Sequence, residues 1–143
     1  MSQWTHVNGA FRFDYVAGVL PPLHWNDILG VDRPSELEEA DWKLCSLPYG
    51  SEGPLLFNIN PHPLRNHLNA FNVQVFGDLR DFGSERVEEI FRWFRGVCHR
   101  CQSGPPYPGI RDAVVTIDVE GGEYRLLTYV DGILSDRLVR KRV

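Results

Sequence analysis

Apolar and polar residues alternate along several segments of this chain, and a period of two is typical of a β-strand with one buried face. The clearest segment is 3–15, in which Val7, Phe11 and Phe13 share one side. Similar patterns predict further strands over four segments: 55–60, 70–76, 113–119 and 123–130. The Glu-Gly-Gly run at 120–122 joins the last two segments and is a signal for a tight hairpin.

A helical period replaces the alternation over residues 84–101. Apolar residues recur there at spacings of three and four, which predicts one amphipathic helix. Its apolar stripe contains Val87, Ile90, Phe91, Phe94, Val97, Cys98 and Cys101. We expect Ser84 to cap its N-terminus and the Gly-Pro-Pro run at 104–106 to end it. A short acidic helix is predicted over 34–42, and a cluster of turns over 48–54.

These elements predict an α+β fold in a single domain that covers residues 1–143. Tight hairpins make antiparallel neighbours, and one long helix covers only one face of a sheet. We therefore expect an antiparallel sheet of about four to five strands with the 84–101 helix packed on one face. A ferredoxin-like arrangement is one version of this fold. Phe91 and Phe94 should be buried between the helix and the sheet.

Composition and charge limit the classes of protein to consider. The chain is 43% hydrophobic and 12% aromatic, as in folded domains. No apolar run approaches the ~20 residues of a membrane span, and the N-terminus lacks the features of a secretory signal. We therefore expect a cytoplasmic protein that does not contact membranes. The net charge of −4 argues against general nucleic-acid binding. The basic C-terminus, with Arg137 and Arg140, is expected to be a solvated tail.

Cys98 and Cys101 form a C-x-x-C pair, a spacing that can bind zinc or act as a redox dithiol. Zinc needs two more ligands, which Cys45, His62 or His67 could supply only if folding brought them together. Both cysteines of the pair lie on the apolar stripe near the helix C-terminus, where the helix dipole disfavours a thiolate. We therefore expect buried, reduced thiols, with no metal and no cofactor.

The sequence contains no recognised catalytic signature, so we assign no catalytic residues. His62 and His67 flank Arg65, and such a group can bind phosphate or relay protons, although loop histidines more often face solvent. The segment 77–83 is expected to be a loop between a strand and the helix. In this loop Arg80 is expected to pair with a neighbouring aspartate, while two carboxylates three residues apart are an alternative site for a divalent metal.

Polar side chains on the predicted strands point to a contact surface. If the strands are neighbours and the helix covers the other side, their polar positions gather on one face that meets water or a partner. Aromatic and arginine side chains on such a face are common anchors of interfaces. The predicted contact residues are Trp4, His6, Asn8, Arg12, Gln74, Asp78, Arg80 and Asp81.

Three motifs carry a resemblance to a known group of proteins. They are Trp-Thr-His-Val at 4–7, Gly-Ser-Glu-Gly-Pro-Leu at 50–55 and Gly-Asp-Leu-Arg-Asp at 77–81. With these motifs the chain resembles small accessory proteins encoded by tailed bacteriophages. The resemblance implies a phage origin and a place in the cytoplasm of the host cell.

Small phage accessory proteins frequently inhibit host defence, so the resemblance favours a non-catalytic protein that binds a host factor. A sequestered signalling nucleotide is a second ligand to consider, with Arg12, Arg65 and Arg80 as phosphate ligands. One alternative is a small enzyme, such as a metal-independent nuclease or a cyclic-nucleotide hydrolase built on His6, His62 or His67. Another alternative is a virion assembly protein. The protein could also form a homo-oligomer.

Overall fold

A computed structural model describes residues 2–16, 47–61, 68–102 and 109–141 of the chain. Its regular elements are β1 (Trp4–Val16), β2 (Tyr49–Gly50), β3 (Gly53–Pro54), β4 (Leu56–Pro61), β5 (Leu68–Arg80), α3 (Val87–Gln102), β6 (Gly109–Val119), β7 (Glu123–Val130) and β8 (Ile133–Lys141). A 3₁₀ turn over Ser84–Arg86 leads directly into α3.

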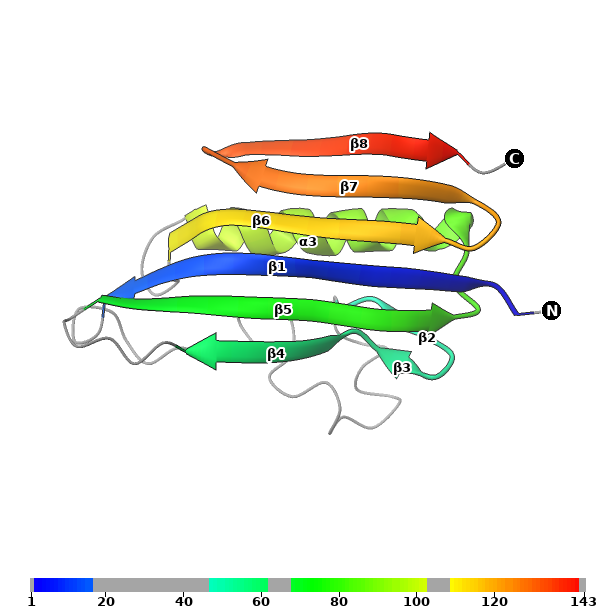
Figure 1. The fold of residues 1–143 in the computed structure, drawn as a ribbon, viewed down its shortest axis with the longest axis horizontal. Helices are drawn as coiled ribbons and strands as arrows, with labels where there is room; N and C mark the ends of the chain where they lie inside the picture. Colours follow the sequence, from blue (N-terminus) through cyan, green and yellow to red (C-terminus); the bar gives the residue numbers. More distant parts are fainter. Residues whose placement is uncertain (1, 17–46, 62–67, 103–108, 142–143) are drawn as a thin grey trace.

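The described strands form a six-stranded sheet in the order β4-β5-β1-β6-β7-β8, in which all neighbours are antiparallel (Figure 1). The helix α3 packs on one face of this sheet, so the predicted α+β fold is confirmed. The predicted sheet was too small, because residues 133–141 form β8 at the edge and are not a solvated tail. Arg137 and Arg140 therefore lie on a strand.

The helix α3 connects β5 to β6, although these two strands are not neighbours. Both pair antiparallel with β1, so they run parallel to each other with β1 between them. Such a β5–α3–β6 crossover is a split βαβ unit, a feature of ferredoxin-like folds. A ferredoxin-like fold needs a second helix, and the part of the chain that the structure describes contains none; that version remains a prediction.

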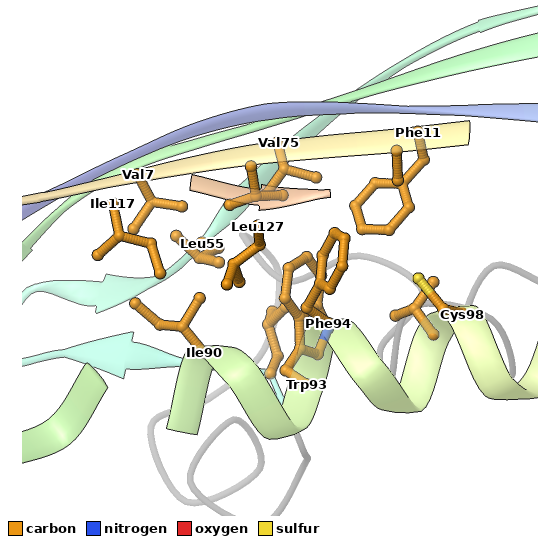
Figure 2. Packing of buried hydrophobic residues seen from close by; sticks show 14 of the residues in the cluster. Val7, Phe11, Leu55, Val75, Ile90, Trp93, Phe94, Cys98, Ile117 and Leu127 are labelled. Atoms are coloured by element: carbon orange, nitrogen blue, oxygen red, sulfur yellow. The ribbon is translucent and has the colours of Figure 1, made fainter. Parts of the chain in front are cut away.

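The core lies between α3 and the sheet, where Phe11, Trp93 and Phe94 meet (Figure 2). The Phe94 ring centroid is 5.6 Å from that of Phe11, and Trp93 meets Phe11 edge-on at 5.7 Å. The prediction for Phe94 is confirmed, since the residue is 2% exposed. The prediction for Phe91 is wrong: it is only half-buried, and Trp93 takes its place in the core.

Three local predictions differ from the structure. They concern the start of the helix, the predicted loop before it and the predicted turns at 48–54. Ser84 is not the cap, because it is the first residue of the 3₁₀ turn that leads into α3; Gly83 is the N-cap of this turn, and no side chain caps the turn. Residues 77–80 belong to β5 rather than to a loop. Within the predicted turns at 48–54, two short strands, β2 and β3, pair with each other.

Several sequence predictions lie outside the described residues. They concern the acidic helix over 34–42, the run at 104–106, Cys45 and the group of His62, Arg65 and His67.

Candidate functional site

The three motifs that are far apart in the sequence meet at one end of the sheet. Trp4-Thr5-His6-Val7 begins β1, the Gly-Asp-Leu-Arg segment at 77–80 ends β5, and residues 50–55 include β3 and the turn before it. This end lies on the right in Figure 1, where β1 starts and β5 and β6 finish. We call the sheet face opposite α3 the open face; the motifs place most of their polar side chains on it.

Register sets the contacts between the first and last motifs. Trp4 pairs with Arg80, and His6 pairs with Asp78, across the β1–β5 ladder. Opposite residues of an antiparallel pair point to the same face. The Arg80 guanidinium lies 6.0 Å from the centre of the Trp4 ring, and its Nη1 donates to Glu52 Oε1 at 2.9 Å. Arg80 therefore links β5 to the aromatic anchor and to the middle motif.

The middle motif is held against the end of β5 by backbone contacts. The Ser51 N–H donates to the Arg80 carbonyl at 2.9 Å, and the Ser51 hydroxyl donates to Asp81 Oδ2 at 2.7 Å. A Cβ atom on Gly50 would lie 2.6 Å from the Arg80 nitrogen, so glycine is required at this close approach. Asp81 adopts a left-handed conformation with a φ of 55°, which aspartate tolerates better than most residues.

His6 lies between two carboxylates, one from β5 and one from the turn after β6. Its Nδ1 is 2.6 Å from Asp78 Oδ1, and its Nε2 is 2.9 Å from Glu120 Oε1. The hydrogen bond with Asp78, reinforced by the one with Glu120, raises the pKa of His6 above its usual value. The imidazolium form donates from both nitrogens, so protonation of His6 stabilises this arrangement.

Acidic groups outnumber basic groups at this end of the sheet. We call the group formed by His6, Glu52, Asp78, Arg80, Asp81 and Glu120 the charged cluster. Its four carboxylates exceed its two cationic side chains even when His6 is protonated. Asp118 adds to this balance, because it pairs with His6 across the β1–β6 ladder. The cluster is therefore an anionic surface.

Asp78 and Asp81 do not converge on a common point. Asp78 contacts His6, whereas Asp81 accepts from Ser51. The expected Arg–Asp pair is present but long, with 4.0 Å between Arg80 Nε and Asp81 Oδ2, and Glu52 is the closer partner of Arg80. Among the described residues, no group of histidine, cysteine, aspartate or glutamate is placed to hold a metal ion.

Arg12 belongs to the open face but lies far from the charged cluster. It pairs with Asn72 on β5, eight register positions from the Trp4–Arg80 pair, and eight residues of strand span roughly 26 Å. Its Nε donates to Asp112 Oδ1 at 2.7 Å, and a second bond joins the same two side chains. The hydrogen bonds from Arg12 lower the pKa of Asp112. Arg12 is thus engaged in its own ion pair.

Asn8 and Gln74 occupy the middle of the open face. Both side chains are exposed, and Gln74 Oε1 accepts from Asn58 at 3.4 Å. Beside them lie Leu56 and Phe76, which face each other across the β4–β5 ladder and are 39% and 40% exposed. We call this pair the apolar patch. It separates the charged cluster from the Arg12 ion pair along β5.

None of the described side chains on the open face is buried, in contrast to the other face of the same strands. On β1, for example, Thr5 and Val7 are fully buried, whereas Trp4 and His6 are partly exposed. The Thr5 hydroxyl donates to the Phe82 carbonyl on the helix side, which ties the start of β1 to the turn before α3. The helix side of the sheet thus fixes the position of the residues on the open face.

Cys98 and Cys101 are buried on α3, as predicted. Burial raises the pKa of each thiol to about 12. A thiol with so high a pKa is protonated at neutral pH and is a poor nucleophile and a poor metal ligand.

Sequence reasoning did not include Glu52 and Glu120 among the contact residues. Glu120 follows β6 with the same parity as Thr116 and Asp118, so the alternation of that strand could have placed it on the open face. Glu52 carries no such signal, because its contact with Arg80 depends on how β2 and β3 pack against β5.

No protein-family model, curated protein or solved structure matches the chain in the comparisons with known proteins. No helix among the described residues is long and apolar enough to cross a membrane.

Proposed function

We propose that the protein is a non-catalytic binding protein and that its partner docks on the open face. The observation that carries this proposal is a sheet face that no described element covers, on which large apolar side chains lie next to the charged cluster. Trp4 is partly exposed, and Leu56 and Phe76 are exposed, although all three could have been placed in a core. Aromatic anchors with a polar surround are typical of interaction surfaces.

The charge of the surface favours a protein partner with basic residues. The charged cluster is anionic, and complementary potentials favour association between two proteins. A nucleotide is a weaker candidate, because Arg12 and Arg80 are roughly 26 Å apart and each is already paired with a carboxylate. Two such arginines do not converge on one phosphate group. Arg65, the third candidate, lies outside the described residues.

The resemblance of the three motifs to accessory proteins of tailed bacteriophages suggests the biological setting. In that setting the partner is a host factor in the cytoplasm of an infected cell, and binding inhibits it. The convergence of all three motifs at one end of the sheet supports this proposal, because it concentrates the quoted residues on one surface.

The enzyme alternative finds less support in the geometry. A general base needs a free nitrogen to accept the substrate proton. Both nitrogens of His6 lie within hydrogen-bonding distance of carboxylates, so neither is free for a substrate. His62 and His67 lie outside the described residues.

A pull-down from infected-host lysate, followed by mass spectrometry of proteins and small molecules, tests the proposed function. We expect Trp4→Ala and Arg80→Ala each to weaken capture of a host protein about fivefold or more, with the melting temperature nearly unchanged. Arg12→Ala tests whether the contact extends along the whole of β1. The matched control is Arg92→Ala, which removes an exposed arginine from α3 on the other side of the sheet.

Two results would contradict the proposed function. One is that the Trp4 and Arg80 variants capture the same protein as fully as the unmodified chain does. The other is that capture falls equally for Arg92→Ala, since this would place the contact on α3 rather than on the open face.

A further inference from the structure

The strand β8 is a long and exposed sheet edge. It covers nine residues, and each of residues 131–140 is exposed. Four apolar side chains lie on it: Ile133, Leu134, Leu138 and Val139, which are 67%, 41%, 46% and 48% exposed. An edge strand leaves half of its backbone N–H and C=O groups open to another strand, and proteins usually shorten or charge such edges to prevent pairing.

A groove runs beside this edge on the helix side of the sheet. It has a volume of about 170 Å³, and its apolar walls come from Phe91 and Phe94 on α3, Leu127 on β7 and Leu134 on β8. The side chains of Leu134, Asp136 and Leu138 point to this side, because they pair with Tyr129, Leu127 and Arg125 across the ladder. The edge and the groove therefore adjoin, and their apolar side chains are interrupted by Arg95, Ser135 and Asp136.

We propose that β8 pairs antiparallel with β8 of a second copy of the chain, so that two sheets join into one. A twofold axis normal to the sheet relates two such strands, and symmetry then places one residue of β8 opposite itself. The pattern of side chains along β8 identifies that residue as Asp136. This proposal is independent of the proposed function.

Apolar side chains match in this register. With Asp136 at the centre, Leu134 lies opposite Leu138 of the second copy. Val139 is the extra residue of a bulge between Leu138 and Arg140, so the regular register ends at Leu138. Apolar pairs directly across an antiparallel ladder stabilise it. The Leu138 side chain of the second copy also lies next to Leu134, which forms part of the wall of the groove. It therefore covers apolar surface of the groove.

Charges match as well. Arg137 comes opposite Ser135 of the second copy, and the end of β8 that carries Arg140, beyond the bulge, approaches the Asp131-Gly132 turn of the second copy. The two Asp136 carboxylates face each other, but each is already held by Arg125 of its own chain at 3.3 Å. The antiparallel arrangement thus brings the basic end of one strand to the acidic turn of the other.

The adjacent registers are unfavourable. A centre at Ser135 places Leu134 opposite Asp136 and Ile133 opposite Arg137. A centre at Arg137 places two arginines directly opposite each other, and like charges at such positions destabilise a sheet. The centre at Asp136 avoids the apolar–polar mismatches of the centre at Ser135, and the two carboxylates that it brings together are each paired with Arg125 of their own chain.

A cysteine scan of the full chain tests the register. Residues opposite each other in an antiparallel pair have Cα atoms roughly 4.5–5.5 Å apart, which suits a disulfide. We expect Asp136→Cys to form a disulfide-linked dimer on mild oxidation, and Ser135→Cys and Arg137→Cys to form far less. The unmodified chain gives the background, since its Cys98 and Cys101 are buried. Equal cross-linking at all three positions, or none above background, overturns the proposal.

Light scattering of the purified chain tests the assembly itself. We expect twice the mass of one chain for the unmodified protein, and at least about a tenfold weaker dimer for Leu138→Lys. The matched control, Val114→Lys, changes an apolar residue of similar exposure on β6, away from the edge, and should leave the dimer intact. A monomer at ~100 µM chain overturns the proposal, as does a Leu138→Lys variant that still dimerises. If Leu138→Lys fails to fold, the cysteine scan decides.

Discussion

At the residue scale, His6 is the group that allows two carboxylates to lie side by side on the open face. Asp78 on β5 and Glu120 after β6 flank the imidazole on β1 from opposite sides. Protonated His6 offsets their mutual repulsion and donates a hydrogen bond to each. Protonation of His6 therefore adds a positive charge to the charged cluster and stabilises the folded protein.

Stability should depend on pH through His6. Its pKa is raised in the folded state, so its contribution is complete below ~6.5 and is lost as the pH rises through the folded pKa. We expect the melting temperature of the unmodified chain to fall more than that of His6→Gln between pH ~6 and ~8.5. Identical pH profiles for the His6 variant and the unmodified chain would show that the pKa is not raised.

Cys98 and Cys101 should be inert in the folded protein. Because burial raises the pKa of both thiols to about 12, we expect iodoacetamide to modify them only after denaturation, as read by peptide mass spectrometry. Elemental analysis should find well under one zinc per chain. A zinc ion bound at one per chain and released only on denaturation would contradict this expectation.

At the scale of elements, α3 places its large aromatic side chains against the middle of the sheet. Trp93 and Phe94 both contact Phe11 at the centre of the core, whereas Phe91 lies at the margin of the helix with Arg125 over its ring at 5.5 Å. Phe91 is therefore on the side of α3 that faces the edge strands. The sheet covers that side of the helix less completely.

Phe94→Ala should lower the free energy of unfolding by roughly 3–5 kcal/mol, because it leaves a cavity in a closely packed core. Denaturant titration measures the change. Phe91→Ala is the matched control, since it removes the same side chain from a half-buried position of the same helix and should have a smaller effect. Equal losses for the two variants would contradict the observed packing of α3.

At the scale of the whole molecule, the proposed dimer keeps both open faces available. A twofold axis normal to the sheet leaves the two faces on the same side, so two copies of the charged cluster face the same way. Linked sites of this kind bind a repetitive or dimeric partner more tightly than one site does. The proposed assembly would therefore strengthen the proposed binding.

Capture of a host protein by the open face should weaken as salt rises. The charged cluster is exposed, and the screening length falls from about 10 Å at 0.1 M salt to about 3 Å at 1 M. We expect less captured protein in pull-downs at ~1 M salt than at ~0.1 M salt, while the melting temperature of the chain is nearly the same at both salt concentrations. Capture that does not respond to salt would indicate that the apolar patch alone carries the contact.

Sequence alone determined the main elements of the fold. The strands β1 and β7, much of β5 and the helix α3 could be predicted because each buries one face, and burial imposes a period of two or of three to four on the residues themselves. The same alternation placed Trp4, His6, Asn8 and Arg12 on one face before any contact was known. A pattern of this kind is local and needs no knowledge of neighbours.

The edge strand β8 was missed because none of residues 133–140 is buried, so its side chains carry no clear period. A local signal was nevertheless present. The Asp131-Gly132 dipeptide lies between two apolar residues and is a typical hairpin turn. Asp131 and Gly132 have positive φ values of 51° and 78°, as a two-residue hairpin turn requires. Turn chemistry could thus have extended the sheet by one strand.

The tertiary structure alone decided which residues form the site. His6 contacts Asp78 and Glu120 across separations of 72 and 114 residues, and these contacts depend on β1 lying between β5 and β6. Strand order and register are set by the packing of the whole core, because a shift of one residue would turn every side chain to the other face. Alternation therefore assigned side chains to the open face, but only the assembled sheet brought three distant motifs together and separated Arg12 from Arg80.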